Sequence, residues 1–213
     1  MNPNVGVGPW TPPGRMETAL DMAERLVLLL LYGQLVWRLW PTLGDQPANG
    51  LLILAETIVV GFVVCRRATQ AITKNPFDWL LALAGTLPPL MLRAGGGHGV
   101  LPSLAAGAMV AGIIVQVSAK FSLRRSFGIA AANRGVKVGG PYLLVRHPMY
   151  LGYAITWIGF VLVNPLGMNF ALVGFAGTMQ IARVIVEERL LRGDPAYRAY
   201  MERVRFRILP GVF

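Results

Sequence analysis

The sequence predicts an all-α integral membrane protein with about six transmembrane helices. Hydrophobic residues make up 54% of the chain and charged residues only 14%, and the mean hydropathy is +0.54. A typical soluble domain carries about 25% charged residues. The apolar residues also form runs of the length that crosses a hydrocarbon layer, and the cations are concentrated between those runs.

The first 121 residues are expected to form an N-terminal arm and four spans. Residues 1–19 are rich in Pro and Gly, which predicts a flexible arm. Pro88 and Pro89 in the third span predict a kink or an early end, and a total of five spans is the alternative if this segment does not cross. Small residues of the fourth span, including Gly107 and Gly112, predict close contact between helices. The four spans are expected at about 20–40, 51–65, 79–92 and 100–121.

The second span carries a carboxyl group, Glu56, in its interior. A carboxyl group is costly in hydrocarbon, so this side chain is expected to face other helices rather than lipid. A hydrogen-bonded position within the bundle is the simpler interpretation, and a functional role is the alternative.

The segment from 139 to 152 gathers polar, aromatic and turn-forming residues in an otherwise apolar chain. Pro148 is suited to the first turn of a helix, so Arg146 and His147 would lie at the mouth of that helix. Unpaired N–H groups at such a position favour anionic ligands. A basic loop that only sets membrane topology is the alternative interpretation.

Two further spans, at about 148–163 and 168–186, are expected to form a helical hairpin with a tight turn at 164–167. After the hairpin, Asp194 and Pro195 predict the N-cap and first turn of another helix. This helix is expected to lie on the membrane or to fold back over the site. Its apolar stripe contains Tyr197, Tyr200, Met201 and Val204.

The last span contains a group of polar residues. Gln180, Arg183 and Glu187 are spaced three and four residues apart, so they share one face of a helix. Glu188 points about 100° away from that face. A simple ion pair between Arg183 and Glu187 is the alternative to a functional site.

The distribution of cations predicts the orientation in the membrane. The net charge is +10, and the loops after the second and fourth spans and the C-terminal tail carry most of the cations, which places them in the cytoplasm. Cations between apolar runs face lipid head groups, so no nucleic-acid partner is expected. The chain has one cysteine and two histidines, which predicts neither an intrachain disulfide nor a metal site.

Taken together, several segments resemble the isoprenylcysteine carboxyl methyltransferase family. The likeness covers about residues 122–210, and the N-terminal spans show no clear match. Related signatures occur in phospholipid and thiol methyltransferases, with a looser likeness to membrane sterol reductases. The segments that carry the resemblance are Gly140-Pro-Tyr142, Arg146-His-Pro-Met-Tyr150, Gly152, Asn164-Pro165, Arg183-x-x-x-Glu187-Glu188 and Tyr197-x-x-Tyr200-x-x-x-Val204.

The resemblance implies a cytosol-facing pocket for S-adenosylmethionine within residues 122–213, with S-adenosylhomocysteine as the product. Arg183 would face the methyl acceptor and is the candidate catalytic residue. The spans within residues 20–121 would help to form a lipid-side cavity for that acceptor. The implied cofactor contacts come from Arg134, Gly135, Val136, Lys137, Tyr142, His147, Pro148, Met149, Tyr150 and Glu187.

The expected function is therefore methylation of a lipophilic acceptor that enters from the bilayer. Carboxyl O-methylation is the leading expectation, with phospholipid N-methylation and thiol S-methylation as alternatives. In a bacterial cell the protein would be a multi-pass protein of the inner (plasma) membrane, with its active site facing the cytoplasm. An NADPH-dependent enzyme of the sterol-reductase type and a non-catalytic membrane scaffold are the alternatives from other classes.

Overall fold

The computed structural model describes residues 15–65, 76–95, 101–123 and 138–212. Within these residues the chain is helical and contains no strand, which confirms the all-α prediction for them. The described residues include the short 3-10 helices η1 (Trp40–Thr42), η2 (Pro88–Met91) and η4 (Gly140–Leu143). The α-helices are α1 (Arg15–Leu39), α2 (Asn49–Cys65), α3 (Pro76–Thr86), α4 (Pro102–Leu123), α5 (Pro148–Val163), α6 (Gly167–Leu191) and α7 (Pro195–Arg203).

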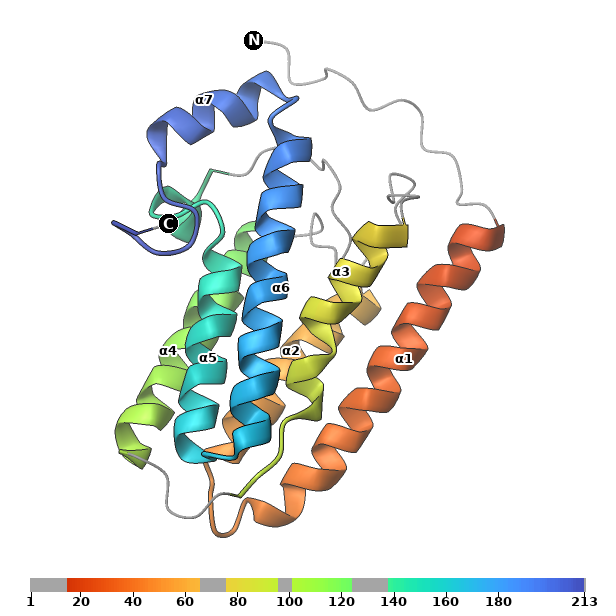
Figure 1. Ribbon diagram of the computed structural model, residues 1–213, viewed down its shortest axis with the longest axis vertical. Coiled ribbons are helices and arrows are strands. Elements are labelled where there is room, and N and C mark those ends of the chain that lie inside the picture. The colour runs from red at the N-terminus through yellow and green to blue at the C-terminus, as the bar shows by residue number, and fades with distance from the viewer. Residues whose placement is uncertain (1–14, 66–75, 96–100, 124–137, 213) are drawn as a thin grey trace.

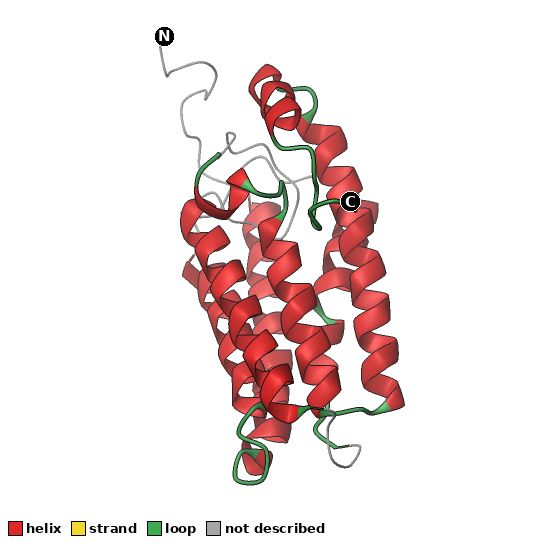
Figure 2. Ribbon diagram, turned by 90° about the vertical axis from the view of Figure 1, so that its left-hand side faces the viewer, coloured by secondary structure: helices red, strands yellow, loops and turns green. Residues whose placement is uncertain are grey.

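Helices α1 to α6 run alternately up and down and form an elongated bundle, and α7 lies across its upper end (Figure 1). Helix α6 packs on α3 and α5, α2 packs on α1, α4 and α5, and the most extensive contact joins α4 to α5. The upper end holds the start of α5, the end of α6 and the C-terminal residues, and the view in Figure 2 shows the same arrangement. We call this end of the bundle the site end.

The observed helices agree with the predicted segments to within a few residues, and the ends of α1 and α3 are informative. Helix α1 begins at Arg15, before the expected start near residue 20, because good helix formers such as Glu17 and Ala19 follow the last N-terminal proline. Helix α3 ends at Thr86, where Pro88 and Pro89 follow in η2. Prolines lack an N–H donor, so the early end predicted for this segment is confirmed.

The tight turn predicted between α5 and α6 is also confirmed, and amide side chains hold it. Asn164 Nδ2 donates to Asn49 Oδ1 at 2.7 Å, which joins the turn to the start of α2. Asn169 Nδ2 donates to the Arg93 carbonyl oxygen at 2.8 Å, and the Gly95 N–H donates to Asn164 Oδ1 at 3.0 Å. These bonds close the end of the bundle opposite the site end.

Two helices of the described residues are long and apolar enough to cross a membrane by length and composition: Pro102–Leu123 and Gly167–Arg189. Helices α2 and α5 are apolar but shorter. Large apolar side chains also lie exposed on the outer faces of the bundle, which is unusual for a protein surrounded by water. They include Leu30 and Trp37 on α1, Ile114 and Phe121 on α4, and Phe175, Ile181 and Ile185 on α6.

Glycines permit the close approach of α4 and α5, as the small residues of the fourth predicted span led us to expect. A Cβ atom added at Gly112 would lie 2.5 Å from Thr156 Oγ1. One added at Gly159 would lie 2.5 Å from Met109 Cγ and 2.7 Å from the Ala105 carbonyl oxygen. The two backbones are therefore too close for a side chain at these positions.

We expect Gly159→Ala to destabilise the fold by about 1–3 kcal/mol, because the added methyl group overpacks the α4–α5 contact. The matched control is Gly174→Ala on α6, where no atom lies within 4 Å of the new Cβ. This change is expected to raise helix stability by up to about 1 kcal/mol. Thermal unfolding of both variants in detergent checks the prediction, and equal melting temperatures would show that the α4–α5 packing is looser than described.

Candidate functional site

The site is built on the first turn of α5. His147 is the N-cap residue of this helix and Pro148 its first residue, as the sequence predicts. The C-terminal tail, residues 204–212, runs along this turn. The N–H of Arg146 donates to the Phe206 carbonyl at 2.9 Å, and that of His147 to the Arg207 carbonyl at 2.7 Å.

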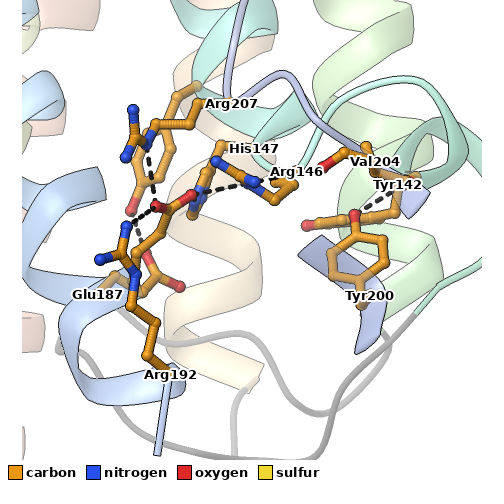
Figure 3. A network of polar contacts seen from close by, with 10 residues as sticks. Tyr142, Arg146, His147, Glu187, Arg192, Tyr200, Val204 and Arg207 are labelled. Atoms are coloured by element: carbon orange, nitrogen blue, oxygen red, sulfur yellow. Dashed lines mark hydrogen bonds and ion pairs between the residues drawn. The ribbon is translucent and has the colours of Figure 1, made fainter. Parts of the chain in front are cut away.

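Helix α7 completes the fold-back of the C-terminal region over the site. Asp194 Oδ1 accepts a hydrogen bond from the Ala196 N–H at 2.8 Å, which confirms the predicted N-cap. Tyr197 and Tyr200 of the predicted apolar stripe are buried. The Tyr200 hydroxyl donates to the Tyr142 carbonyl at 2.7 Å (Figure 3). Burial raises the pKa of Tyr200 to about 12, so this hydroxyl stays protonated and able to donate at neutral pH.

Glu188 is the centre of the polar contacts beneath the tail. Its carboxylate is 1% exposed. Oε1 lies 2.8 Å from Arg146 Nε and 3.4 Å from His147 Nε2, while Oε2 accepts a hydrogen bond from Arg207 Nε at 2.9 Å. Arg192, which is half-exposed, lies 3.6 Å from Oε2. We call Arg146, His147, Glu188, Arg192 and Arg207 the tail cluster, and Figure 3 shows it.

The sequence pattern does not indicate the central role of Glu188. Helical geometry separates Glu188 from the face of Arg183 and Glu187, as expected, but that direction leads to α5 and the tail rather than away from the site. One signal was present in the sequence: Arg192 follows Glu188 by one helical turn, a spacing that suits an ion pair. The approach of the tail could not be read from local spacing.

Tyr150 links Glu187 to Arg183. Its hydroxyl donates to Glu187 Oε2 at 3.1 Å, and its ring centroid lies 5.5 Å from Arg183 Cζ. Arg183 Nη1 also lies 3.3 Å from Gln180 Oε1 and 3.5 Å from Thr86 Oγ1. The predicted face of Gln180, Arg183 and Glu187 is thus turned toward α3 and α5.

Arg183 and Tyr150 also line a small cavity between α2, α3, α5 and α6. Its volume is about 30 Å³, enough for about two water molecules or a small polar group. The other lining residues are Glu56, Val59, Gly85, Thr86, Met149, Tyr153, Trp157 and Gln180.

The structure therefore divides the predicted site residues into two neighbouring groups. His147 belongs to the tail cluster, whereas Met149 and Tyr150 reach the cavity. Tyr142 is buried in η4, and Pro148 is buried at the start of α5. The predicted residues Arg134, Gly135, Val136 and Lys137 lie outside the described residues.

Two of the N–H groups proposed for anion binding at the helix mouth are used within the protein. The His147 N–H donates to the Arg207 carbonyl, and the Tyr150 N–H donates to the His147 carbonyl at 3.2 Å.

Within the described ranges, no group of three His, Cys, Asp or Glu side chains could hold a metal ion.

The fold is a helical bundle with a small cavity between α2, α3, α5 and α6, and the C-terminal region folds back over the start of α5 at the site end. Residues 101–194 match the sequence model of the phospholipid methyltransferase family. The match extends from the start of α4 to the N-cap of α7, so it includes Tyr150, Arg183 and Glu187. It covers less than half of the chain and does not single out the isoprenylcysteine carboxyl methyltransferases. No curated protein is a significant match to the sequence.

Proposed function

We propose that this chain is an S-adenosylmethionine-dependent methyltransferase that acts at a membrane on a lipophilic acceptor. The observation that supports this function best is the position of Tyr150 within the segment that matches phospholipid methyltransferases. Its hydroxyl contacts Glu187, and its ring contacts Arg183 at the cavity. Tyr150 thus lies between Glu187, which we propose binds the cofactor, and Arg183, which we propose binds the methyl acceptor.

Glu187 is suited to the cofactor side. S-adenosylmethionine supplies an electrophilic methyl group on a sulfonium, and it also carries an ammonium and a carboxylate. A carboxylate offers about four acceptor positions, so Glu187 can bind an ammonium while it accepts the hydrogen bond from Tyr150. The half-burial of Glu187 leaves it accessible to such a ligand. The proposed cofactor contacts of residues 134–137, Tyr142 and His147 rest on the family resemblance.

Arg183 is suited to the acceptor side. A guanidinium binds a carboxylate or a phosphate through paired hydrogen bonds, and Arg183 lines the cavity. Methyl transfer requires the acceptor and the methyl group to be held in line, so the main task of these residues is orientation and exclusion of water. The family match favours a phospholipid acceptor. Carboxyl O-methylation and thiol S-methylation are the alternative reactions.

The distribution of charge supports a cytoplasmic position for the site. Exposed arginines of α6, α7 and the tail, including Arg189, Arg198, Arg203 and Arg205, lie at the site end. Cation-rich segments next to apolar helices are retained on the cytoplasmic side. We therefore propose a multi-pass protein of the inner membrane whose site opens toward the cytoplasm.

The proposed reaction can be tested with purified protein in nanodiscs and S-adenosylmethionine labelled at its methyl group. The acceptors are dioleoylphosphatidylethanolamine, a farnesylated cysteine with a free carboxyl group, and a long-chain thiol. We expect enzyme-dependent transfer of label to the phospholipid amine. Transfer to the farnesylcysteine as a base-labile ester would assign carboxyl methylation instead. Absence of transfer to all three, together with binding of NADPH, would favour the reductase alternative.

A further inference from the structure

Glu56 lies in the wall of the cavity that contains Arg183, although the two residues are far apart in sequence. Glu56 is on α2, outside the segment that matches the methyltransferase family, and is 5% exposed. From the sequence, a hydrogen-bonded position within the bundle is the simpler interpretation of this carboxyl group. The structure buries Glu56 within the bundle, as expected, and also places it at the cavity.

The surroundings of Glu56 hold it in place. Its polar neighbours are the Trp157 side chain and the buried Lys120. Lys120 is itself fully buried, donates to Gln116 Oε1 at 2.9 Å and lies 4.8 Å from the centroid of the Tyr153 ring. The rings of Tyr153 and Trp157 are stacked with centroids 5.6 Å apart. Glu56 is thus presented to the cavity by a set of packed partners.

The cavity therefore has a guanidinium on the α6 side and a carboxylate on the α2 side. A head group that fits both walls carries an anionic oxygen for Arg183 and a hydrogen-bond-donating group, such as an ammonium, for Glu56. An acceptor whose only polar group is a carboxylate would meet the like charge of Glu56, which disfavours it.

We propose that Glu56 is a specificity-determining residue that binds the donor group of the methyl acceptor opposite Arg183. This inference rests on the proposed function, because it concerns the acceptor side of the same site. In this proposal, α2 helps to select the head group of the methyl acceptor. A purely structural ion pair between Glu56 and Lys120 would instead affect stability without changing the preference for a head group.

Native mass spectrometry of the purified protein tests the inference without requiring turnover. The probes are dioleoylphosphatidylethanolamine, which has an ammonium, and dioleoylphosphatidylglycerol, which has hydroxyl groups and a net negative charge. We expect the wild-type protein to retain the first lipid about tenfold better, since an ion-assisted hydrogen bond contributes a factor of this order. Glu56→Gln is expected to remove most of this preference.

The matched control is Glu24→Gln, which removes another buried carboxyl group, on α1, that is not part of the cavity wall. It is expected to leave the lipid preference unchanged. Glu56→Asp serves as a second variant if Glu56→Gln does not fold, because it keeps a negative charge near Lys120 but withdraws it from the cavity. A partial loss of preference is expected.

An equal lipid preference in the wild type and in the folded Glu56 variants would overturn the inference, as would a wild type without any preference for the ammonium lipid. Binding of S-adenosylhomocysteine by each protein is measured in parallel. Failure of the wild type to bind it would contradict the proposed function, whereas normal binding with an unchanged lipid preference would contradict only the role of Glu56.

Discussion

Glu188→Gln is expected to lower the free energy of unfolding by about 3–5 kcal/mol, the typical cost of removing one member of a buried ion pair. The carboxylate is 1% exposed and lies 2.8 Å from Arg146 Nε, whose side chain is 6% exposed. Loss of the negative charge leaves this buried guanidinium without its counter-ion. The bond from Arg207 is weakened as well, so the tail should separate from the first turn of α5.

Thermal unfolding in detergent measures the stability effect, and limited proteolysis reports on release of the tail. The control is Glu187→Gln, one residue earlier on α6, where the side chain is only half-buried and the bonding partner Tyr150 is neutral. This control should change the stability little. Similar stability and protease resistance for both variants would show that the tail cluster does not hold the C-terminal region in place.

Arg183→Ala is expected to reduce methyl transfer by about 10²–10³-fold, the effect of removing one group that orients or stabilises the reacting atoms. Its affinity for S-adenosylhomocysteine should stay within about twofold of wild type, because Arg183 lines the cavity of the proposed acceptor side while Glu187 serves the cofactor side. The split between turnover and cofactor binding distinguishes an acceptor-facing role from a structural one.

Steady-state rates with the labelled cofactor and calorimetric affinities provide the two quantities. Arg189→Ala is the matched control, since Arg189 lies on the same helix with an exposed side chain. It should retain both turnover and affinity. A parallel loss of turnover and affinity in Arg183→Ala would mean that Arg183 maintains the fold of the pocket rather than orienting the acceptor.

The elements that the sequence predicts well are those that local chemistry determines. Asp194 and Pro195 define the start of α7, Pro148 defines the start of α5, and Pro88 with Pro89 defines the early end of α3. The Asp194 side chain accepts a hydrogen bond from the nearby Ala196 N–H, and the prolines lack the N–H donor that a helix interior requires. Such signals need no information about distant parts of the chain.

The roles of Glu188 and Glu56 could not be predicted in the same way. Glu187 and Glu188 are adjacent, and only the path of the tail determines that Glu188 becomes the buried partner of Arg146 and His147. Likewise, the shared cavity of Glu56 and Arg183 arises from contacts among helices that are distant in sequence. Helical spacing assigns a residue to a face but does not identify what packs against that face.

The proposed function depends most directly on cofactor binding, which calorimetric titration of the purified protein with S-adenosylhomocysteine measures. We expect saturable binding by the wild type and an affinity about 10–100-fold lower for Glu187→Ala, because the variant loses a charge-assisted hydrogen bond. Absence of binding by a folded wild-type protein would contradict the assignment as a methyltransferase, and saturable binding of NADPH in its place would identify a reductase.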